Sequence, residues 1–387
     1  IAGKTGIGKV TRFPTEEFSS RIAGEVKDFQ PEKVMNRKEI RRTDLYTQYA
    51  YQAAREAMIS SGFGADFLDD VRFGVIIGSG IGGIETFEQQ TRTYLEKGAG
   101  RVSPFFITMM IADIASGRLA IEYGLKGPNF STTSACASSG HAIGTAYNMI
   151  RCGMADRMLA GGAEAPIVPI SFAGFCANRA LSTRNDEPER ASRPFDVDRD
   201  GFIMGEGAGC LVLETLESAQ ERGATIYAEI AGFGATADAF HITAPSEDGD
   251  GAARVMHMAM ADAGIGVEQV DYINTHGTST PAGDIAEAIA ISKVFGNQLD
   301  KVKVNSTKSM IGHLLGAAAA VEAIVVVQSI RDQKLHPTLN VENKEAVAEG
   351  IDLIEDSAIS HKVNYALNNS FGFGGHNSSI VIKAFDG

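Results

Sequence analysis

The sequence predicts an α/β protein made of two similar halves, and two internal repeats are the basis of this prediction. The first repeat has the order helix, glycine, short acidic link, strand and glycine turn. It occurs at 58–80 and again at 260–280, with Gly62 and Gly264 at equivalent places. Glycine ends a helix at such a place because it adopts the left-handed backbone without strain. Each half should therefore supply a strand and a glycine turn at corresponding positions.

The second repeat relates 130–150 to 304–324, where a turn of small residues leads into a helix and a Gly-His pair stands at the same point of each. Both helices are apolar on nearly all sides, which predicts that they are buried. Each half should then hold a central helix between sheets, and both helix N-termini should face one shared site. We place the halves at 1–225 and 226–387.

The remaining elements follow from hydrophobic periodicity and from the glycines that punctuate it. Helical spacing of apolar residues ends at Gly62, and short apolar runs bounded by glycine indicate buried strands. In chain order we expect an irregular entry over 1–40, a helix over 44–61, a strand and glycine turn over 71–83, a helix after residue 136, a strand and another glycine turn over 156–166 and a strand followed by a helix over 208–223.

Composition narrows the class of protein. The 387 residues are 44% hydrophobic and 21% charged, as in soluble globular chains. The net charge of −13 argues against nucleic acid as the main partner. No apolar run is long enough to cross a membrane, and the richest, 317–327, is interrupted by Glu322. Four cysteines without CxxC spacing favour a reducing compartment, so we expect a cytoplasmic protein or a mature chain imported into an organelle. Ile1 is no natural start, so we expect a truncated or processed N-terminus.

Cys136 stands where the second repeat turns into its helix, so we expect it in the first helical turn. A helix N-terminus carries partial positive charge and unpaired backbone N–H groups, which lower a thiol pKa. Ala137, Ser138 and Gly140 are small, so a substrate carbonyl has room to approach the sulfur. The alternative is a buried structural cysteine, which is common.

Two motifs suggest other chemistry. Gly78-x-Gly80-x-x-Gly83 follows a strand as a dinucleotide fingerprint does, but no strand ending in an acidic residue comes about twenty residues later. The stretch 196–201 begins like a calcium-binding loop, but its twelfth position is Gly207 instead of glutamate. We therefore favour neither ligand, although a nicotinamide oxidoreductase stays an alternative.

Three further segments are rich in glycine and hydroxyl residues, and each follows a predicted strand: 274–284, 306–313 and 368–377. Turns at strand ends are where α/β folds place chemistry. His276 and His313 lie in the first two of them. Either histidine alone could be a core residue with satisfied hydrogen bonds. Two of them at corresponding ends of a duplicated fold, with a cysteine at a helix start, indicate one catalytic site.

These motifs resemble the beta-ketoacyl-[acyl-carrier-protein] synthases of the type II elongating class, within the thiolase-like condensing enzymes. The resemblance rests on "ACAS", "HGTSTPAGD", "STKSMIGH" and "NSFGFGGHN", and it covers the chain apart from the family's first strand and helix. It implies a thiolase-like duplicated fold with five layers, α-β-α-β-α. Thiolases use a second cysteine near the C-terminus, whereas the last cysteine here is Cys210.

The resemblance also implies a chemistry. Cys136 accepts an acyl group from acyl carrier protein, and the backbone N–H groups of Cys136 and Phe373 form an oxyanion hole. His276 and His313 stabilise the enolate that forms when malonyl-carrier loses CO₂. Lys308 has an orienting and electrostatic role, and Phe373 is the gate between the two steps.

Further residues take roles by resemblance, except that the docking residues are predicted from a local basic cluster on a chain of net charge −13. Phe106 should come from a neighbouring subunit, because the family's pocket is completed across a homodimer interface. His376 replaces a threonine found in many members, and we assign it no role. The residues that line the substrate path should be Ile81, Phe106, Phe175, Phe202, Thr278, Thr280 and Gly374. Glu322 should support the site, and a monovalent cation should be held by Asn274, Glu322, Asn368 and Asn369. The acidic carrier protein should dock at Lys38, Arg41, Arg42 and Arg179.

No cofactor beyond the phosphopantetheine arm of the carrier is expected. Acyl-chain preference is not readable from the sequence. Four alternatives stay open: a polyketide ketosynthase, a coenzyme A-dependent thiolase, a nicotinamide oxidoreductase and a noncatalytic assembly subunit.

Overall fold

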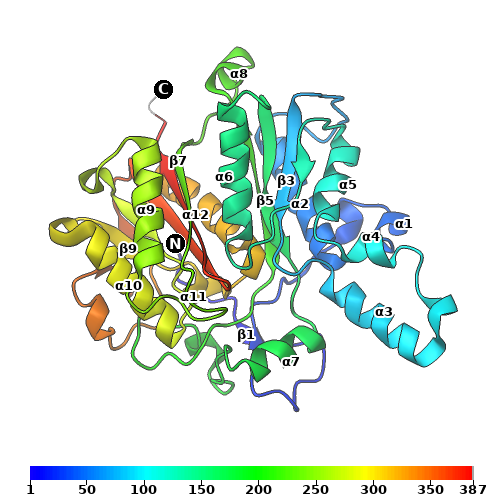
Figure 1. Ribbon diagram of the computed structural model, residues 1–387, viewed down its shortest axis with the longest axis horizontal. Coiled ribbons are helices and arrows are strands. Elements are labelled where there is room, and N and C mark those ends of the chain that lie inside the picture. The colour runs from blue at the N-terminus through cyan, green and yellow to red at the C-terminus, as the bar shows by residue number, and fades with distance from the viewer. Residues whose placement is uncertain (386–387) are drawn as a thin grey trace.

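A computed structural model describes residues 1–385, so the last two residues of the predicted second half, 386–387, lie outside the described part. Two sheets form the frame (Figure 1). The first has the order β4-β3-β5-β6 and the second the order β11-β9-β8-β13-β14-β7. Strands of the first sheet are β3 (Phe73–Gly78), β4 (Asn129–Phe130), β5 (Arg157–Glu164) and β6 (Gly207–Glu214). Those of the second are β7 (Glu229–Ala237), β8 (Tyr272–Asn274), β9 (Lys303–Asn305), β11 (Asp352–Leu353), β13 (Tyr365–Gly372) and β14 (His376–Lys383).

The strand β3 shows why the first sheet is mainly parallel and buried. All six of its residues are buried, as expected for a run of apolar residues covered on both faces. It pairs in parallel with β4 and β5, and β6 closes the sheet antiparallel to β5. The second sheet repeats this plan: β8, β9 and β13 run parallel, and β14 is antiparallel to β13.

Two helices, α6 (Ser138–Arg151) and α12 (Ala318–Asp332), lie between the sheets. They share one hydrophobic cluster, which includes Ile143 and Val326 and takes in strands of both sheets. On α6, a Cβ added at Gly140 would overlap Ser378, and one added at Gly144 would overlap the ring of Phe233. These glycines therefore let α6 pack closely against the second sheet, as the predicted central helices require.

Outer helices complete five layers, α-β-α-β-α. The helices α2 (Leu45–Ser60) and α5 (Ile114–Tyr123) cover the outer face of the first sheet. The helices α9 (Asp250–Ala263) and α10 (Pro281–Phe295) cover the outer face of the second. The thiolase-like layering expected from the resemblance is thus confirmed.

The helix predicted over 44–61 is α2, which Asp44 caps and which ends before Gly62 at φ +85°. The helices α3 (Ile84–Lys97) and α4 (Phe106–Met110) project from the body of the molecule (Figure 1). Within 1–385, no helix is long and apolar enough to cross a bilayer. The other elements are α1 (Arg37–Ile40), α7 (Pro169–Ala177), α8 (Leu216–Glu221), α11 (Lys308–Ile311), β1 (Gly8–Lys9), β2 (Ile22–Ala23), β10 (Lys334–Leu335) and β12 (Ile359–Ser360).

Candidate active site

Cys136 lies in the turn between β4 and α6, and not in the first turn of the helix as the sequence predicted. The helix begins at Ser138, with Ala137 as its N-cap residue. Ala135 has φ +50°, a left-handed conformation that turns the chain sharply just before the cysteine. The thiol therefore stands ahead of the helix N-terminus, with 8% of the residue exposed.

The predicted lowering of the thiol pKa is wrong for this structure. Burial raises the pKa of the Cys136 thiol to about 12, against the opposing effects of the Lys308 charge and the backbone N–H of Phe373. Burial dominates because a thiolate loses its hydration in an apolar surrounding. The resting group is therefore a thiol, and the sequence pattern could not reveal this because it does not show how deeply the turn is covered.

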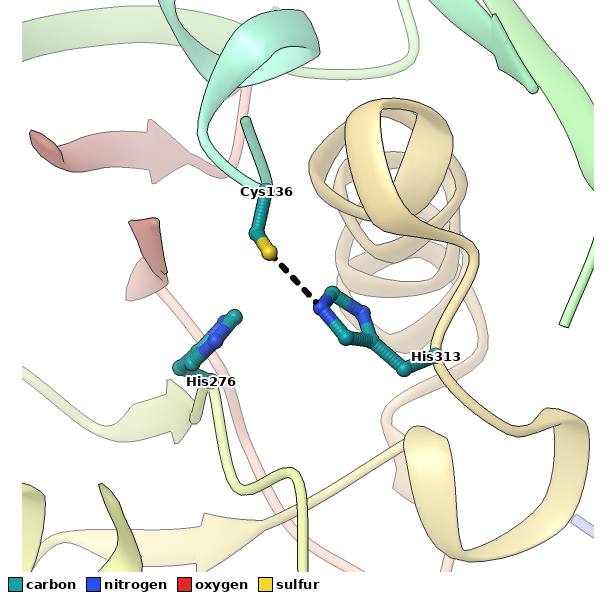
Figure 2. Close-up of side chains that lie close together, drawn as sticks. All are labelled: Cys136, His276 and His313. Carbon is teal, nitrogen blue, oxygen red and sulfur yellow. Dashed lines mark hydrogen bonds between the residues drawn. The ribbon is translucent and has the colours of Figure 1, made fainter. Parts of the chain in front are cut away.

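His276 and His313 lie beside the thiol, as predicted (Figure 2). The Nε2 atom of His313 is 2.9 Å from Sγ of Cys136, and the centroids of the two imidazoles are 5.2 Å apart. Burial and the nearby Lys308 charge hold the pKa of each histidine well below its usual value. Both rings are thus neutral, and each carries one N–H.

Backbone contacts hold both histidines in place. His276 follows β8, and its backbone N–H donates to Glu287 on α10 at 2.9 Å, while that of Gly277 donates at 2.8 Å. Burial raises the pKa of Glu287 to about 7. The backbone of His313 is bonded to the segment 203–205 through Ile203 and Gly205. This role of Glu287 was not predicted from the sequence. The sequence feature that could have indicated it is a carboxylate on the apolar helix that follows the His276 turn.

Lys308 and Glu322 form a buried ion pair behind the histidines. The Nζ to Oε1 distance is 2.5 Å, and each side chain is 1% exposed. Lys308 does not line the cavity described below, but its charge lowers the pKa of Cys136, His276 and His313. This arrangement agrees with an electrostatic role for the lysine and a supporting role for Glu322, both of which stay predictions.

The hairpin between β13 and β14 covers the thiol. Its turn contains Phe373, and Gly374 and Gly375 have φ of +85° and +72°, which favour glycine. A Cβ added to Gly372 would lie 2.8 Å from the carbonyl oxygen of Ser134, closer than side chains tolerate, and 3.0 Å from the backbone nitrogen of Cys136. The backbone N–H of Phe373 acts to lower the pKa of the Cys136 thiol, and its part in an oxyanion hole stays a prediction.

A cavity of about 470 Å³ opens onto these groups. Thr278 and Thr280 stand in its wall with their hydroxyl oxygens 2.9 Å apart. Of the predicted residues it is lined by Ile81, Cys136, Phe175, Arg179, Phe202, His276, Thr278, Thr280, His313 and Phe373.

Two predicted lining residues do not lie in this wall. Gly374 is one position away from the lining residue Phe373. Phe106 is at the start of α4, with its ring 6.5 Å from that of Phe87. The contribution of Phe106 to a neighbouring subunit stays a prediction.

Three of the four residues predicted to hold a cation have a buried oxygen atom without a hydrogen-bond partner in residues 1–385, and the cation site itself stays a prediction. Within the described residues, Oδ1 of Asn274, Oε2 of Glu322 and Oδ1 of Asn368 are buried without a hydrogen-bond partner. Oxygen ligands of this kind suit hard cations. Asn369 differs, because its Oδ1 accepts a hydrogen bond from Ser379.

The predicted docking residues occupy two places. Lys38 and Arg41 are exposed at α1, and the Arg42 guanidinium stacks over the ring of Phe105 at 4.2 Å. Arg179 is exposed after α7, at the cavity mouth, and α1 and α7 lie well apart (Figure 1). A carrier that contacts both places must span the distance between them.

The two other motifs have structural explanations. The backbone N–H groups of Gly80 and Ile81 donate to the side chain of Glu164, so the groups that would bind a pyrophosphate are already hydrogen-bonded. The carboxylate of Asp196 accepts hydrogen bonds from Arg193 and from backbone N–H groups, among them that of Glu342. In each motif, groups that its pattern would offer to a ligand are thus already hydrogen-bonded within the protein.

Comparisons with known proteins agree with this geometry. The family models "Beta-ketoacyl synthase, N-terminal domain" and "Beta-ketoacyl synthase, C-terminal domain" match residues 1–219 and 227–342. The chain is 50% identical over 386 residues to 3-oxoacyl-[acyl-carrier-protein] synthase 2 of Staphylococcus aureus, covering 100% of this chain and 93% of the relative. It is 50% identical over 385 residues to the protein of the same name from Vibrio cholerae, covering 99% and 93%.

Solved structures give the same result. A beta-ketoacyl synthase from Burkholderia phymatum superposes with a TM-score of 0.93 at 36% identity, over 99% of this chain and 93% of that one. A type II PKS ketosynthase complex with its acyl-carrier protein superposes with a TM-score of 0.91 at 35% identity, also over 99% and 93%. With both halves matched and full-length relatives at 50% identity, this chain belongs to the beta-ketoacyl synthase family.

Proposed function

We propose that this protein condenses an acyl group held on Cys136 with malonyl-acyl carrier protein, releasing CO₂ and giving beta-ketoacyl-acyl carrier protein. This is the elongation step of fatty acid biosynthesis. The observation that carries the proposal is the approach of the Cys136 thiol to His313 Nε2 at 2.9 Å, with neutral His276 beside it, inside one cavity.

In the first step, Sγ of Cys136 attacks the thioester carbonyl of the acyl-carrier. The tetrahedral oxyanion receives hydrogen bonds from the backbone N–H groups of Cys136 and Phe373. The bond to the pantetheine sulfur breaks, and the proton of the Cys136 thiol ends on that sulfur. The Lys308 charge favours the thiolate as it forms, because it opposes the effect of burial.

In the second step, malonyl-carrier occupies the emptied site. His276 and His313 donate hydrogen bonds to its thioester oxygen, which requires Nε2–H tautomers. Loss of CO₂ then leaves an enolate whose charge these two donors stabilise. Neutral rings suit this role. Since the pKa of each histidine lies well below its usual value, neither ring changes its protonation near pH 7, and the N–H that faces the substrate is retained.

In the third step, the enolate carbon attacks the acyl-Cys136 carbonyl and a carbon–carbon bond forms. Cys136 leaves as a thiolate and takes a proton from solvent, which its raised pKa favours. The product is longer by two carbons. The order of the steps gives ping-pong kinetics.

The partners follow from the substrates. We propose that acyl carrier protein docks at Lys38, Arg41, Arg42 and Arg179, that the chain acts as a homodimer in the cytoplasm, and that its two halves meet near residue 225. We further propose that a monovalent cation is held by Asn274, Glu322 and Asn368, where it would offset the negative charge of Glu322. No redox cofactor takes part in the proposed reaction.

Intact mass after incubation with acyl-carrier protein tests the proposal. The protein should gain the mass of one acyl group, peptide mapping should place it on Cys136, and later addition of malonyl-carrier should remove it with release of CO₂. An adduct that coenzyme A thioesters form and reverse without CO₂ release would instead indicate a thiolase. Products extended more than once without reduction would indicate a polyketide ketosynthase.

A further inference from the structure

Glu164 is a buried carboxylate that the proposed reaction does not use. It ends β5 and is 0% exposed. Its Oε1 accepts from the hydroxyl of Ser79 at 2.9 Å and from the backbone N–H of Ile81 at 3.1 Å. Its Oε2 accepts from the backbone N–H groups of Gly80 at 2.6 Å and Gly316 at 2.9 Å. All four donors are neutral, and in the described part of the chain no lysine or arginine forms an ion pair with it.

These four donors belong to both halves of the molecule. Ser79, Gly80 and Ile81 form the turn after β3, whereas Gly316 lies between His313 and α12. The chain comes so close here that a Cβ added at Gly316 would overlap the backbone nitrogen of Gly80. One carboxyl group therefore joins two backbone segments from different halves of the molecule.

Both segments form the wall of the cavity. Gly80 and Ile81 line it from the first half, and Leu315 lines it from the second. Leu315 has φ +46°, a left-handed conformation that a branched residue keeps only when its surroundings impose it. The hydroxyl of Ser79 also accepts from the backbone N–H of Gly82 at 3.0 Å, so the carboxylate orders the whole glycine turn.

We propose that Glu164 is a positioning residue that fixes the Ile81 and Leu315 walls of the cavity and thereby sets the length of acyl chain that the cavity accepts. The proposal rests on the proposed function, since it takes the cavity to be the acyl site. A carboxylate suits this position because it only accepts hydrogen bonds, and all its neighbours donate. In the E164Q variant an amide NH₂ faces backbone N–H groups, so part of the wall is released.

The test uses N-alkyl iodoacetamides, which alkylate Cys136 without any carrier protein or condensation. Rates for N-hexyl and N-tetradecyl reagents are followed on the full chain by mass spectrometry of the peptide that contains Cys136, because the exposed Cys152 is alkylated as well. For E164Q we expect the tetradecyl-to-hexyl rate ratio to rise by about tenfold, the selectivity that a misfit of one or two methylene groups produces in an apolar pocket. An unchanged ratio in folded E164Q would overturn the proposal.

D44N is the matched control. Asp44 is also buried and also accepts from backbone N–H groups, those of Tyr46 at 3.3 Å and Thr86 at 2.8 Å, but it does not line the cavity. The tetradecyl-to-hexyl rate ratio of D44N should equal that of the wild type, even if the substitution lowers the melting temperature. An equal shift in D44N and E164Q would show general loosening of the fold and would also overturn the proposal.

If E164Q does not fold, the same alkylation measurement is made on the S79A variant. It removes one donor to Glu164 and the link to Gly82, so the ratio should shift in the same direction by a smaller factor. The alkylation ratio is read without condensation. A wild-type protein that fails to condense malonyl-carrier would contradict the proposed function, whereas an unchanged ratio in a condensing enzyme would contradict the role of Glu164 alone.

Discussion

The sulfur of Cys136 lies 2.9 Å from Nε2 of His313, although the two residues are 177 positions apart in the chain. Each stands just before a central helix, Cys136 before α6 and His313 before α12. The site therefore exists only where the two halves meet. Any change in how α6 and α12 pack together alters the distance between the nucleophile and its partner.

The first prediction concerns the division of labour in the site. Cys136→Ala should abolish acyl-enzyme formation and leave decarboxylation of malonyl-carrier measurable. His276→Ala and His313→Ala should retain part of the acyl transfer but lose decarboxylation and chain extension by about 10²–10³-fold, as when an oxyanion donor is removed. Radiolabelled acyl transfer and CO₂ release on the same three variants provide the measurement. CO₂ release at the wild-type rate by either histidine variant would refute the two-histidine mechanism.

The second prediction concerns pH. Because burial raises the pKa of Cys136 to about 12, the thiolate fraction should grow about tenfold for each pH unit below that value. The alkylation rate of Cys136 by iodoacetamide should therefore rise steadily from pH 6 to pH 10. A plateau below pH 8 would mean that the thiol is acidic, as the helix position first suggested. The exposed Cys152 serves as the internal reference in the same mass spectra.

The third prediction concerns docking of the carrier. Charge reversal at Lys38 and Arg41 should raise KM for carrier-bound substrates and weaken the dependence of KM on salt. Turnover of small pantetheine thioesters should stay near that of the wild type. Arg42 is left unchanged in this variant because it stacks over Phe105, so its loss would also disturb packing.

The control for docking reverses the charges of Lys334 and Lys362, two other exposed lysines. This double variant changes the net charge of the protein by the same amount. Its KM for carrier-bound substrates should follow the wild type. If both double variants lost affinity equally, net charge and not a local surface would attract the carrier.

The fourth prediction concerns the buried ion pair. Lys308→Met leaves Glu322 without its cation, and breaking a buried pair costs about 3–5 kcal/mol. Urea unfolding should show a loss of this order, and Lys308→Met with Glu322→Gln together should recover much of it. The loss should shrink below pH 7, since burial raises the pKa of Glu322 to about 7 and a protonated Glu322 needs no partner. An equally large loss in the double variant would mean that packing, not charge, explains the effect.

Much of the fold could be predicted because its signals are local. The helix α2 starts at a capping Asp44 and stops before Gly62, and both signals stand in the sequence. The repeats predicted the two central helices, since apolar residues on every side of a helix indicate burial wherever the helix packs. The three residues predicted to be catalytic were found by motif, and the structure brings Cys136, His276 and His313 together.

What could not be predicted depends on packing between distant segments. The thiol pKa depends on how the hairpin at Phe373 covers Cys136, which no local pattern shows. Glu164 looked like the end of an ordinary strand, although it binds backbone groups some 84 residues before it and 152 residues after it. Phe106 was assigned by resemblance, and a single chain does not show which subunit it serves.

The absent side chains of Gly140 and Gly144 have a consequence for how this molecule comes apart. At these two positions α6 packs directly against the second sheet, with no room for a Cβ atom. The halves thus cannot separate while each keeps its own core. We therefore expect one calorimetric transition for the whole chain, with equal van't Hoff and calorimetric enthalpies. The two halves repeat one plan, and close packing at two glycines makes them unfold as one unit.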